Sequence, residues 1–330
     1  MSPISNSFTR TSLCSWTSND SVVDVFPMQE APFPTTVPWL FFGKEQLAMQ
    51  SSDLIYSFIL TSKESGHILA VFHCLPGAQQ WTSPPLAPFG GIMPVAHCHE
   101  RQLTFLLFCI RKWAIRMGCK TLTVKTAPAC YHPLTHEICH RSYLAAGFSP
   151  NHTYSNHYIP ITGQRFDQII EPAERRRLAK GKNTGLHIYL KQGFCDETTG
   201  TMLRECDRAH GRQLRVAPGE LNRIVSASPE SYVTVTARNG EQTVAAALLV
   251  RVASHVLYHF LSGFLPEFRT ISPSLMLFET AYQYCGNNGI QILDLGISLD
   301  HLGHEKTSLA SFKRRIGGQG CPKIIYEAMI

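Results

Sequence analysis

The sequence predicts a protein of the α/β (α+β) class with two domains in tandem, each a mixed, antiparallel-rich sheet flanked by helices. Three observations predict this architecture. The chain has 330 residues, and a domain usually holds about 100–200 residues. Each half contains a β-hairpin, a glycine bend, a helix, a strand and a second helix, which indicates a duplication. The glycines that mark these elements recur at intervals that match to within one residue: Gly91, Gly118 and Gly147, then Gly263, Gly289 and Gly318.

The composition indicates a folded chain with a mild positive charge. Hydrophobic residues make up 44% of the sequence and charged residues 16%, a low charge content that argues against disorder. The 30 Lys and Arg against 24 Asp and Glu give a net charge of +6, which permits an anionic ligand without identifying a nucleic-acid binder. The apolar runs, such as residues 244–250, have the length of a strand. We therefore expect no membrane span.

The N-terminal region and the cysteines predict a cytoplasmic protein. Residues 1–16 contain one Arg and no apolar core, so we expect no secretory signal. The 11 cysteines are an odd number and are spread along the chain, which favours reduced thiols. Residues 1–21 are rich in Ser and Thr and predict a loose lead-in.

The first domain is expected at residues 22–163. Two alternating strands are joined by a turn at 62–66, and the helix after them has apolar residues at helical spacing until Gly118 ends it. The expected elements are, in order, strands 53–61 and 67–75, helix 99–117, strand 119–125, helix 136–146 and strand 157–161.

The second domain is expected at residues 164–330, with a leading basic segment at 171–185. Its hairpin turns at Asn239-Gly240, a strong hairpin signal. Its first long helix begins at Ser272-Pro273, a favourable N-cap residue followed by proline at the first helical position. The expected elements are strands 232–237 and 242–252, helix 272–285, strand 290–297, helix 309–316 and strand 323–328.

Four motifs of the second half resemble the GNAT acyltransferase fold. They are YHFLSG (258–263), EFRTISPSLMLFETAYQYC (267–285), GIQILDLGIS (289–298) and LASFKRRIGG (309–318). The segment ERRRLAKGKNTG (174–185) is similar to the basic segment before the second domain of tandem-GNAT proteins of the FemABX type, which include peptidoglycan bridge-forming enzymes. In the first half only SPPLAPFGGI (83–92) adds to the likeness. The resemblance implies two GNAT-like domains in tandem and an N-acyltransferase activity.

The predicted phosphate-binding loop departs from the GNAT pattern. GNAT enzymes that use acyl-CoA carry Q/R-x-x-G-x-G/A at the start of this helix, where free backbone N–H groups hold the pyrophosphate. Here the stretch is Arg269-Thr-Ile-Ser272-Pro273-Ser274. Serines replace both glycines, and Pro273 removes a donor. Arg269, Ser272 and Ser274 remain candidates for contacting a phosphate, and we expect acetyl-CoA to bind weakly or not at all.

Three residues are candidates for the chemistry of acyl transfer, which needs a proton acceptor, a donor to the oxyanion and a proton for the leaving group. Asp294 interrupts an apolar strand, where burial would raise the pKa of its carboxyl group; a structural role is equally open. The resemblance implies that Lys313 faces the reacting carbonyl, with a solvated basic face as the alternative. Tyr258 is a candidate acid, with core packing as its alternative.

Two further clusters carry potential ligands. Residues 175–182 contain five positive charges, and Arg176 and Lys180 lie one helical turn apart. They are candidates for binding a phosphate of tRNA, of a nucleotide-linked acceptor or of CoA, with a solvated linker helix as the alternative. The Cys and His residues within 130–140 match no common zinc spacing, so no metal site is expected.

Taken together, the patterns and the resemblance predict an N-acyltransferase without a bound cofactor. It would move an acyl or aminoacyl group from acyl-CoA or aminoacyl-tRNA to a small-molecule or peptide amine, with the reaction centre in the second domain and the acceptor partly held by the first. The alternative is a non-catalytic tandem-GNAT protein that binds a ligand or partner, and a weaker third hypothesis is RNA binding through 175–182. The sequence contains neither G-x-S-x-G nor a P-loop, which argues against hydrolases and nucleoside triphosphatases.

Overall fold

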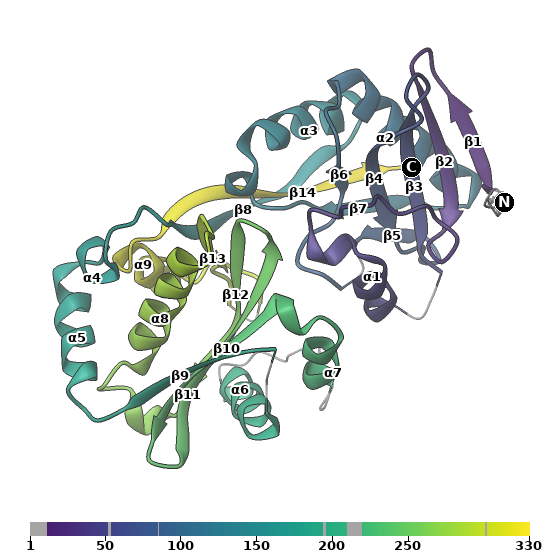
Figure 1. Cartoon of the computed structure of the whole chain (residues 1–330). Helices are drawn as coiled ribbons and strands as arrows, with labels where there is room; N and C mark the ends of the chain where they lie inside the picture. Colours follow the sequence, from purple (N-terminus) through teal and green to yellow (C-terminus); the bar gives the residue numbers. More distant parts are fainter. Residues whose placement is uncertain (1–11, 52–53, 85, 194–195, 210–219, 301) are drawn as a thin grey trace, which may run out of the picture. The chain divides into compact units, whose positions relative to one another are not determined.

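The computed structural model describes residues 12–51, 54–84, 86–193, 196–209, 220–300 and 302–330. It divides into two compact units, shown in Figure 1. Unit 1 comprises Met1–Thr153 and Lys323–Ile330, and unit 2 comprises Tyr154–Pro322. The chain leaves unit 1 within β8 (Ser149–Pro160) and returns to it within β14 (Gln319–Met329).

Unit 1 holds two groups of strands with α2 (Glu100–Arg116) and α3 (Pro133–Ala145) as its long helices. The first group has the order β1-β2-β3-β4-β6 and is antiparallel, and the second has the order β5-β7-β14-β8. The strands are β1 (Cys14–Thr17), β2 (Ser21–Pro27), β3 (Tyr56–Ser62), β4 (Ile68–Cys74), β5 (Gln80–Ser83), β6 (Ile92–Pro94) and β7 (Thr121–Lys125). The short helices are η1 (Leu40–Phe42), α1 (Lys44–Gln50) and η2 (Ala129–Tyr131).

Unit 2 is built on a sheet of order β8-β13-β12-β11-β10-β9. Its strands are β9 (His187–Gln192), β10 (Tyr232–Asn239), β11 (Gln242–Ala253), β12 (Val256–Phe264) and β13 (Ile292–Ile297). All neighbours are antiparallel except β12 and β13. The helices are α4 (Phe166–Ile169), α5 (Pro172–Lys182), α6 (Glu197–Ala209), α7 (Glu220–Ala227), η3 (Pro229–Ser231), η4 (Pro266–Phe268), α8 (Pro273–Asn287) and α9 (Thr307–Arg315).

The two units repeat one element order, as the sequence predicts. The hairpin β3-β4 corresponds to β10-β11, α2 to α8, β7 to β13 and α3 to α9. Gly118 and Gly289 follow the ends of the corresponding helices α2 and α8 with φ of 75° and 66°. The units differ where unit 2 has the single strand β12, because unit 1 has two short strands: β5 pairs with β7, and β6 pairs with β4. The predicted fold class and tandem arrangement are confirmed.

The final strand of each repeat lies in the sheet of the other unit. Residues Tyr154–Pro160 of β8 belong to unit 2, where β8 pairs with β13, and Lys323–Met329 of β14 belong to unit 1, where β14 pairs with β7. The expected ranges 22–163 and 164–330 assigned each final strand to its own half. The alternation of side chains along a strand predicts that the strand exists, but it does not indicate which sheet the strand joins.

The expected loose lead-in at 1–21 needs a correction, because β1 and the start of β2 fall within it. Trp16 of β1 packs edge-on against Trp113 of α2, with ring centroids 6.4 Å apart. This contact anchors β1 to the hydrophobic core of unit 1, which the Ser-rich composition of the segment does not indicate. Residues 1–11 of the lead-in, Asp53 of the expected strand 53–61 and Pro85 of the motif 83–92 lie outside the described residues.

Each unit has its own hydrophobic core. In unit 1 the predicted stripe of α2 is buried against the sheets: Leu103, Leu106, Leu107, Ile110 and Trp113. In unit 2 the buried face of α8 carries Leu275, Phe278, Tyr282 and Cys285. No helix in the described part of the chain combines the length and apolar character needed to cross a membrane.

Candidate functional site

The candidate site is a cleft in unit 2 where two parallel strands separate. Strands β12 and β13 pair only from Val256↔Ile292 to Tyr258↔Asp294, although β12 continues to Phe264. A register shift between Leu248 and Leu249 of β11 falls opposite Phe260, which is left as an extra residue on β12. Residues 258–264 of β12 and 295–297 of β13 then line one cleft of about 780 Å³. A volume of this size accommodates a small-molecule substrate.

The N-terminus of α8 borders the cleft with the predicted phosphate-binding residues. Arg269, Ser272 and Ser274 all line it. Ser272 has φ 54° and ψ 54°, and it is the one non-glycine residue of the described chain with positive φ. This left-handed conformation costs a side-chain-bearing residue about 1–2 kcal/mol. The loop therefore keeps a backbone geometry suited to glycine at a position where the GNAT pattern has glycine.

Helix α5 brings two cations to the cleft, Arg177 and Lys180. Gly181 lets α5 approach the start of α8 closely, because a Cβ there would lie 3.0 Å from the carbonyl oxygen of Ile271, just before the helix, and 3.2 Å from Sδ of Met276 within it. Glu174 is 1% exposed and accepts hydrogen bonds from Arg315 Nε at 2.7 Å and from Arg177 Nη1 at 3.3 Å. The sequence predicts that both Arg176 and Lys180 bind a phosphate. Lys180 lines the cleft, but Arg176 does not. Its neighbour Arg177 lies on the face of α5 that lines the cleft.

Lys313 is 6% exposed and lines the cleft from α9. Its Nζ donates to the carbonyl oxygens of Gly296 at 2.9 Å and Ile297 at 2.8 Å. The alternative of a solvated basic face thus applies only to its neighbour Arg314, which is exposed. Lys313 holds the end of β13 and places a positive charge at the cleft.

Asp294 is 2% exposed and is not among the residues that line the cleft. Its Oδ1 accepts hydrogen bonds from Asn156 Nδ2 at 2.7 Å and from the backbone N–H of Gly296 at 2.8 Å. These bonds tie β13 to β8 and shape the bend at Gly296, whose φ is 71°. These contacts fit the alternative interpretation of Asp294 as a structural residue. Its carboxylate fixes the bend at Gly296, and Lys313 contacts the same bend.

Tyr258 and its neighbour His259 both line the cleft. The ring of Tyr258 packs over Gly296, where a Cβ would lie 3.3 Å from Tyr258 Cε2. Burial and the nearby Asp294 raise the pKa of the Tyr258 phenol well above its usual range, so the hydroxyl stays protonated at neutral pH.

His259 is a candidate that the sequence motifs did not single out. Its ring stacks on Phe278 with centroids 4.6 Å apart and an interplanar angle of 24°. Burial and the positive charge of Lys313 lower the pKa of His259 to about 4, so its imidazole is neutral at pH 7. Within the described residues, its buried Nε2 has no hydrogen-bond partner. Strand alternation places His259 and Tyr258 on opposite faces of β12. Both line the cleft, because the cleft lies along the edge of β12 where its pairing with β13 ends.

The charged side chains at the cleft are mostly positive: Arg177, Lys180, Arg269 and Lys313. The acidic residue Glu174 is already paired with two arginines. A cleft with this balance attracts an anionic ligand.

Comparisons with known proteins find one matching family model and several similar folds. Residues 191–314 match the family model described as an acetyltransferase (GNAT) domain. The crystal structure of FemX superposes with a TM-score of 0.64 at 13% identity, covering 88% of this chain and 92% of that one. A tandem GNAT protein from the clavulanic acid biosynthesis pathway gives a TM-score of 0.53 at 8% identity, with 83% and 82% covered.

The structure of L-PGS from Bacillus licheniformis is also similar, with a TM-score of 0.51, 13% identity and 86% of both chains covered. A search of curated protein sequences gives no match. The second unit thus carries a GNAT domain. The chain as a whole has a fold similar to those of FemX and of the tandem GNAT protein.

Proposed function

We propose that the cleft of unit 2 transfers an acyl or aminoacyl group from an activated donor, a thioester or an aminoacyl-tRNA, to an amine acceptor. The observation that carries the proposal is the separation of β12 and β13 in a GNAT domain, which exposes Tyr258, His259 and Lys313 in one cleft. An imidazole, a phenol and an ammonium group in one cleft suit a reaction in which the amine loses a proton and the leaving group gains one.

In the proposed reaction the acceptor amine attacks the carbonyl carbon of the donor. His259 Nε2 accepts the proton that the amine loses as the new C–N bond forms, since its imidazole is neutral. The ammonium of Lys313 lies at the cleft and stabilises the negative charge of the tetrahedral intermediate. The C–S or C–O bond to the leaving group then breaks, and the phenol of Tyr258 supplies its proton. Asp294 acts as a positioning residue through Gly296.

The side chains that line the cleft beside the start of α8, called here the cationic rim, are proposed to bind the phosphate of the donor. Arg269, the hydroxyls of Ser272 and Ser274, and Lys180 with Arg177 line the cleft beside the start of α8. Pro273 removes one backbone donor at this helix start. Side chains therefore take over contacts that backbone N–H groups make in the usual GNAT loop, and we expect acetyl-CoA to bind weakly.

A non-catalytic ligand-binding protein is the second candidate function. The altered loop favours it, because Ser272 and Ser274 replace the glycines that let acyl-CoA enzymes approach the pyrophosphate, and Pro273 removes a backbone donor. Such a protein would bind the same anionic ligand without transferring a group.

A thermal-shift panel tests donor binding with acyl-CoAs, non-hydrolysable aminoacyl-tRNA analogues and inorganic pyrophosphate. A true donor raises the melting temperature by mass action. We expect one donor class to give this shift and Arg269→Ala and Lys180→Ala to abolish it. The control Lys112→Ala, at an exposed lysine of unit 1, should leave it unchanged. A shift that survives Arg269→Ala, or no shift with any donor, would contradict the proposed site.

A further inference from the structure

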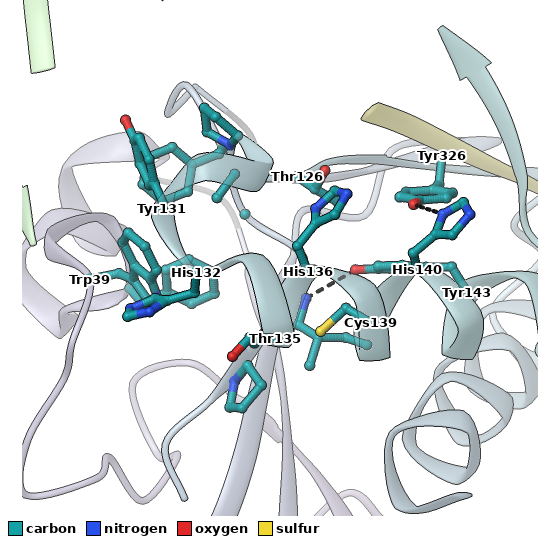
Figure 2. A pocket seen from close by; sticks show the side chains of 17 residues that line it. Trp39, Thr126, Tyr131, His132, Thr135, His136, Cys139, His140, Tyr143 and Tyr326 are labelled. Carbon is teal, nitrogen blue, oxygen red and sulfur yellow. Dashed lines mark hydrogen bonds between the residues drawn. The ribbon is translucent and has the colours of Figure 1, made fainter. Parts of the chain in front are cut away.

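A second pocket lies entirely within unit 1, at the place that corresponds to the cleft of unit 2. It is bounded by α3, which corresponds to α9 of unit 2, and by the residues after β7, which correspond to the end of β13. Its third boundary is β6, which corresponds to the second part of β12. Figure 2 shows Trp39, Tyr131 and His132 grouped on one side of the pocket and His140, Tyr143 and Tyr326 on the other.

Tyr143 of α3 takes the place that Lys313 has on α9. Both residues lie three positions before the C-cap of their helix, which is Ala146 in α3 and Ile316 in α9. Both are buried and both line the pocket of their own unit. Where unit 2 presents an ammonium group, unit 1 therefore presents a neutral hydroxyl.

The lining of the unit 1 pocket contains no Asp, Glu, Lys or Arg. Burying an unpaired charge there would be costly, so this lining favours an uncharged ligand. Its Cys and His residues do not gather as metal ligands either, as no such group is found among the described residues. Burial and the neighbouring His140 lower the pKa of His136, which keeps its imidazole neutral at pH 7.

Several polar hydrogens in this pocket lack an acceptor. Tyr143 is 1% exposed, and its oxygen accepts from the backbone N–H of Ile92 at 3.0 Å, but its own O–H finds no acceptor in the described chain. His140 Nδ1 and the Tyr326 hydroxyl lie 2.6 Å apart. Whichever of them donates, the pair keeps one polar hydrogen that this contact does not use. The imidazole of His136 has no hydrogen bond to any described residue.

The size of the pocket limits what it can take. Its volume is about 60 Å³, well below the roughly 150 Å³ of a cavity that accepts a benzene ring. A group of a few heavy atoms fits, and an aromatic ring does not.

We propose that this pocket of unit 1 binds an uncharged amide group the size of acetamide, a carboxamide or N-acyl group of a ligand whose remainder lies outside. The carbonyl oxygen of the amide accepts from the Tyr143 hydroxyl, the amide N–H donates to His136, and the methyl or methylene group contacts the aromatic walls. This binding is independent of the transfer proposed for unit 2, so either proposal can fail alone.

The test is an NMR titration of the full-length protein with labelled histidine, using acetamide, acetate and acetamidinium as probes of one size and three charges. We expect saturable shifts of the His136 and His140 signals with acetamide alone. The dissociation constant should be on the order of 10 mM, since affinity scales with the number of ligand atoms. The signals are assigned with His136→Gln, and His97→Gln, at an exposed histidine outside the pocket, is the matched control.

Two variants separate the pocket from the fold. Tyr143→Phe should weaken acetamide binding by about 5-fold, the equivalent of one hydrogen bond. Because it also leaves the Ile92 N–H without an acceptor, Ala127→Leu serves as the second variant: it fills the pocket and removes no hydrogen bond. Equal shifts with acetate, no shift with acetamide, or full binding by Ala127→Leu would overturn the proposal.

Discussion

At Lys313, one side chain serves both the fold and the proposed chemistry. Its ammonium is held by the carbonyls of Gly296 and Ile297 and lies at the cleft. The sequence pattern placed Lys313 in a run of three cations and gave no sign of these bonds. The burial of Lys313 therefore changes what its substitution does, because the loss of charge and the loss of two hydrogen bonds come together.

Lys313→Met should reduce both turnover and stability. We expect turnover to fall by about 10²–10³-fold, as for loss of an oxyanion-stabilising group. The free energy of unfolding should fall by about 1.5–3 kcal/mol, because two carbonyls lose a charged donor. Urea unfolding and initial-rate measurements check the two effects. Arg314→Met, at the exposed neighbour, is the control, and a Lys313→Met protein with unchanged stability would contradict the buried placement.

His259 should make stability depend on acid pH. The ordinary pKa of a histidine side chain, 6.5, falls to about 4 for His259 in the folded protein, so between these values the unfolded chain binds a proton that the folded chain does not. The free energy of unfolding therefore falls as pH falls through this window. We expect His259→Gln to show a smaller loss of stability than the wild type between pH 6.5 and 4, measured by urea unfolding. His97→Gln should follow the wild-type curve; identical curves for all three proteins would refute the assignment.

Among the elements, α8 determines the shape of the cationic rim. It begins at Ser272 in a left-handed conformation, followed by Pro273, and its first turn carries Ser274. The two serines occupy the glycine positions of the GNAT pattern but differ in backbone conformation, since only Ser272 has positive φ. Their replacement by glycine should therefore have opposite effects on stability.

Ser272→Gly should stabilise unit 2 by about 1 kcal/mol, because glycine adopts the left-handed region without steric cost. Ser274→Gly should destabilise it by about 0.5 kcal/mol, because glycine is a poorer helix former. Urea unfolding followed by far-UV circular dichroism measures both. Destabilisation by Ser272→Gly would mean that its side chain contributes more to the loop than its backbone conformation costs.

Periodicity and turn residues were sufficient to predict most elements. The apolar stripe of α2, the Asn239-Gly240 hairpin and the Ser272-Pro273 helix start all lie where the patterns indicate. These signals are local, because a helix stripe or a hairpin turn depends on neighbours within a few residues.

The rest of the site depends on contacts between distant segments. His259 reaches the cleft because β12 leaves β13 after Tyr258, and nothing in the sequence marks that point. Arg177 rather than Arg176 lines the cleft, since the buried face of α5 is set by Glu174, which pairs with the distant Arg315. Asp294 was a candidate for chemistry from its apolar context, but its partners Asn156 and Gly296 become visible only in the fold.

For the whole molecule, the last strand of the chain completes the first unit. Residues Lys323–Ile330 belong to unit 1, where Tyr326 is 1% exposed and stacks on Tyr143 with centroids 4.3 Å apart. All 4 tryptophans of the chain also lie in unit 1: Trp16, Trp39, Trp81 and Trp113. Tryptophan emission therefore reports the unfolding of this unit.

Tyr326→Ala should destabilise unit 1 by about 3–5 kcal/mol, the usual cost of truncating a buried aromatic residue. The urea midpoint of tryptophan emission should fall accordingly. Met329→Ala, on the same strand but 71% exposed, is the matched control and should leave the midpoint unchanged. Equal midpoints for Tyr326→Ala and the wild type would contradict the placement of β14 in unit 1.

Acyl transfer in the cleft of unit 2 can be measured by following a labelled acyl group from donor to amine. The donors are aminoacyl-tRNA and acyl thioesters, the acceptor is a peptide with a free amine, and the product is identified by mass spectrometry. His259→Gln is compared with His157→Gln, whose histidine is also buried and influenced by Lys313 but does not line the cleft. We expect transfer by the wild type and by His157→Gln, with the rate of His259→Gln reduced by about 10²-fold or more. Equal rates for all three proteins, or no transfer from any donor by the wild type, would contradict it.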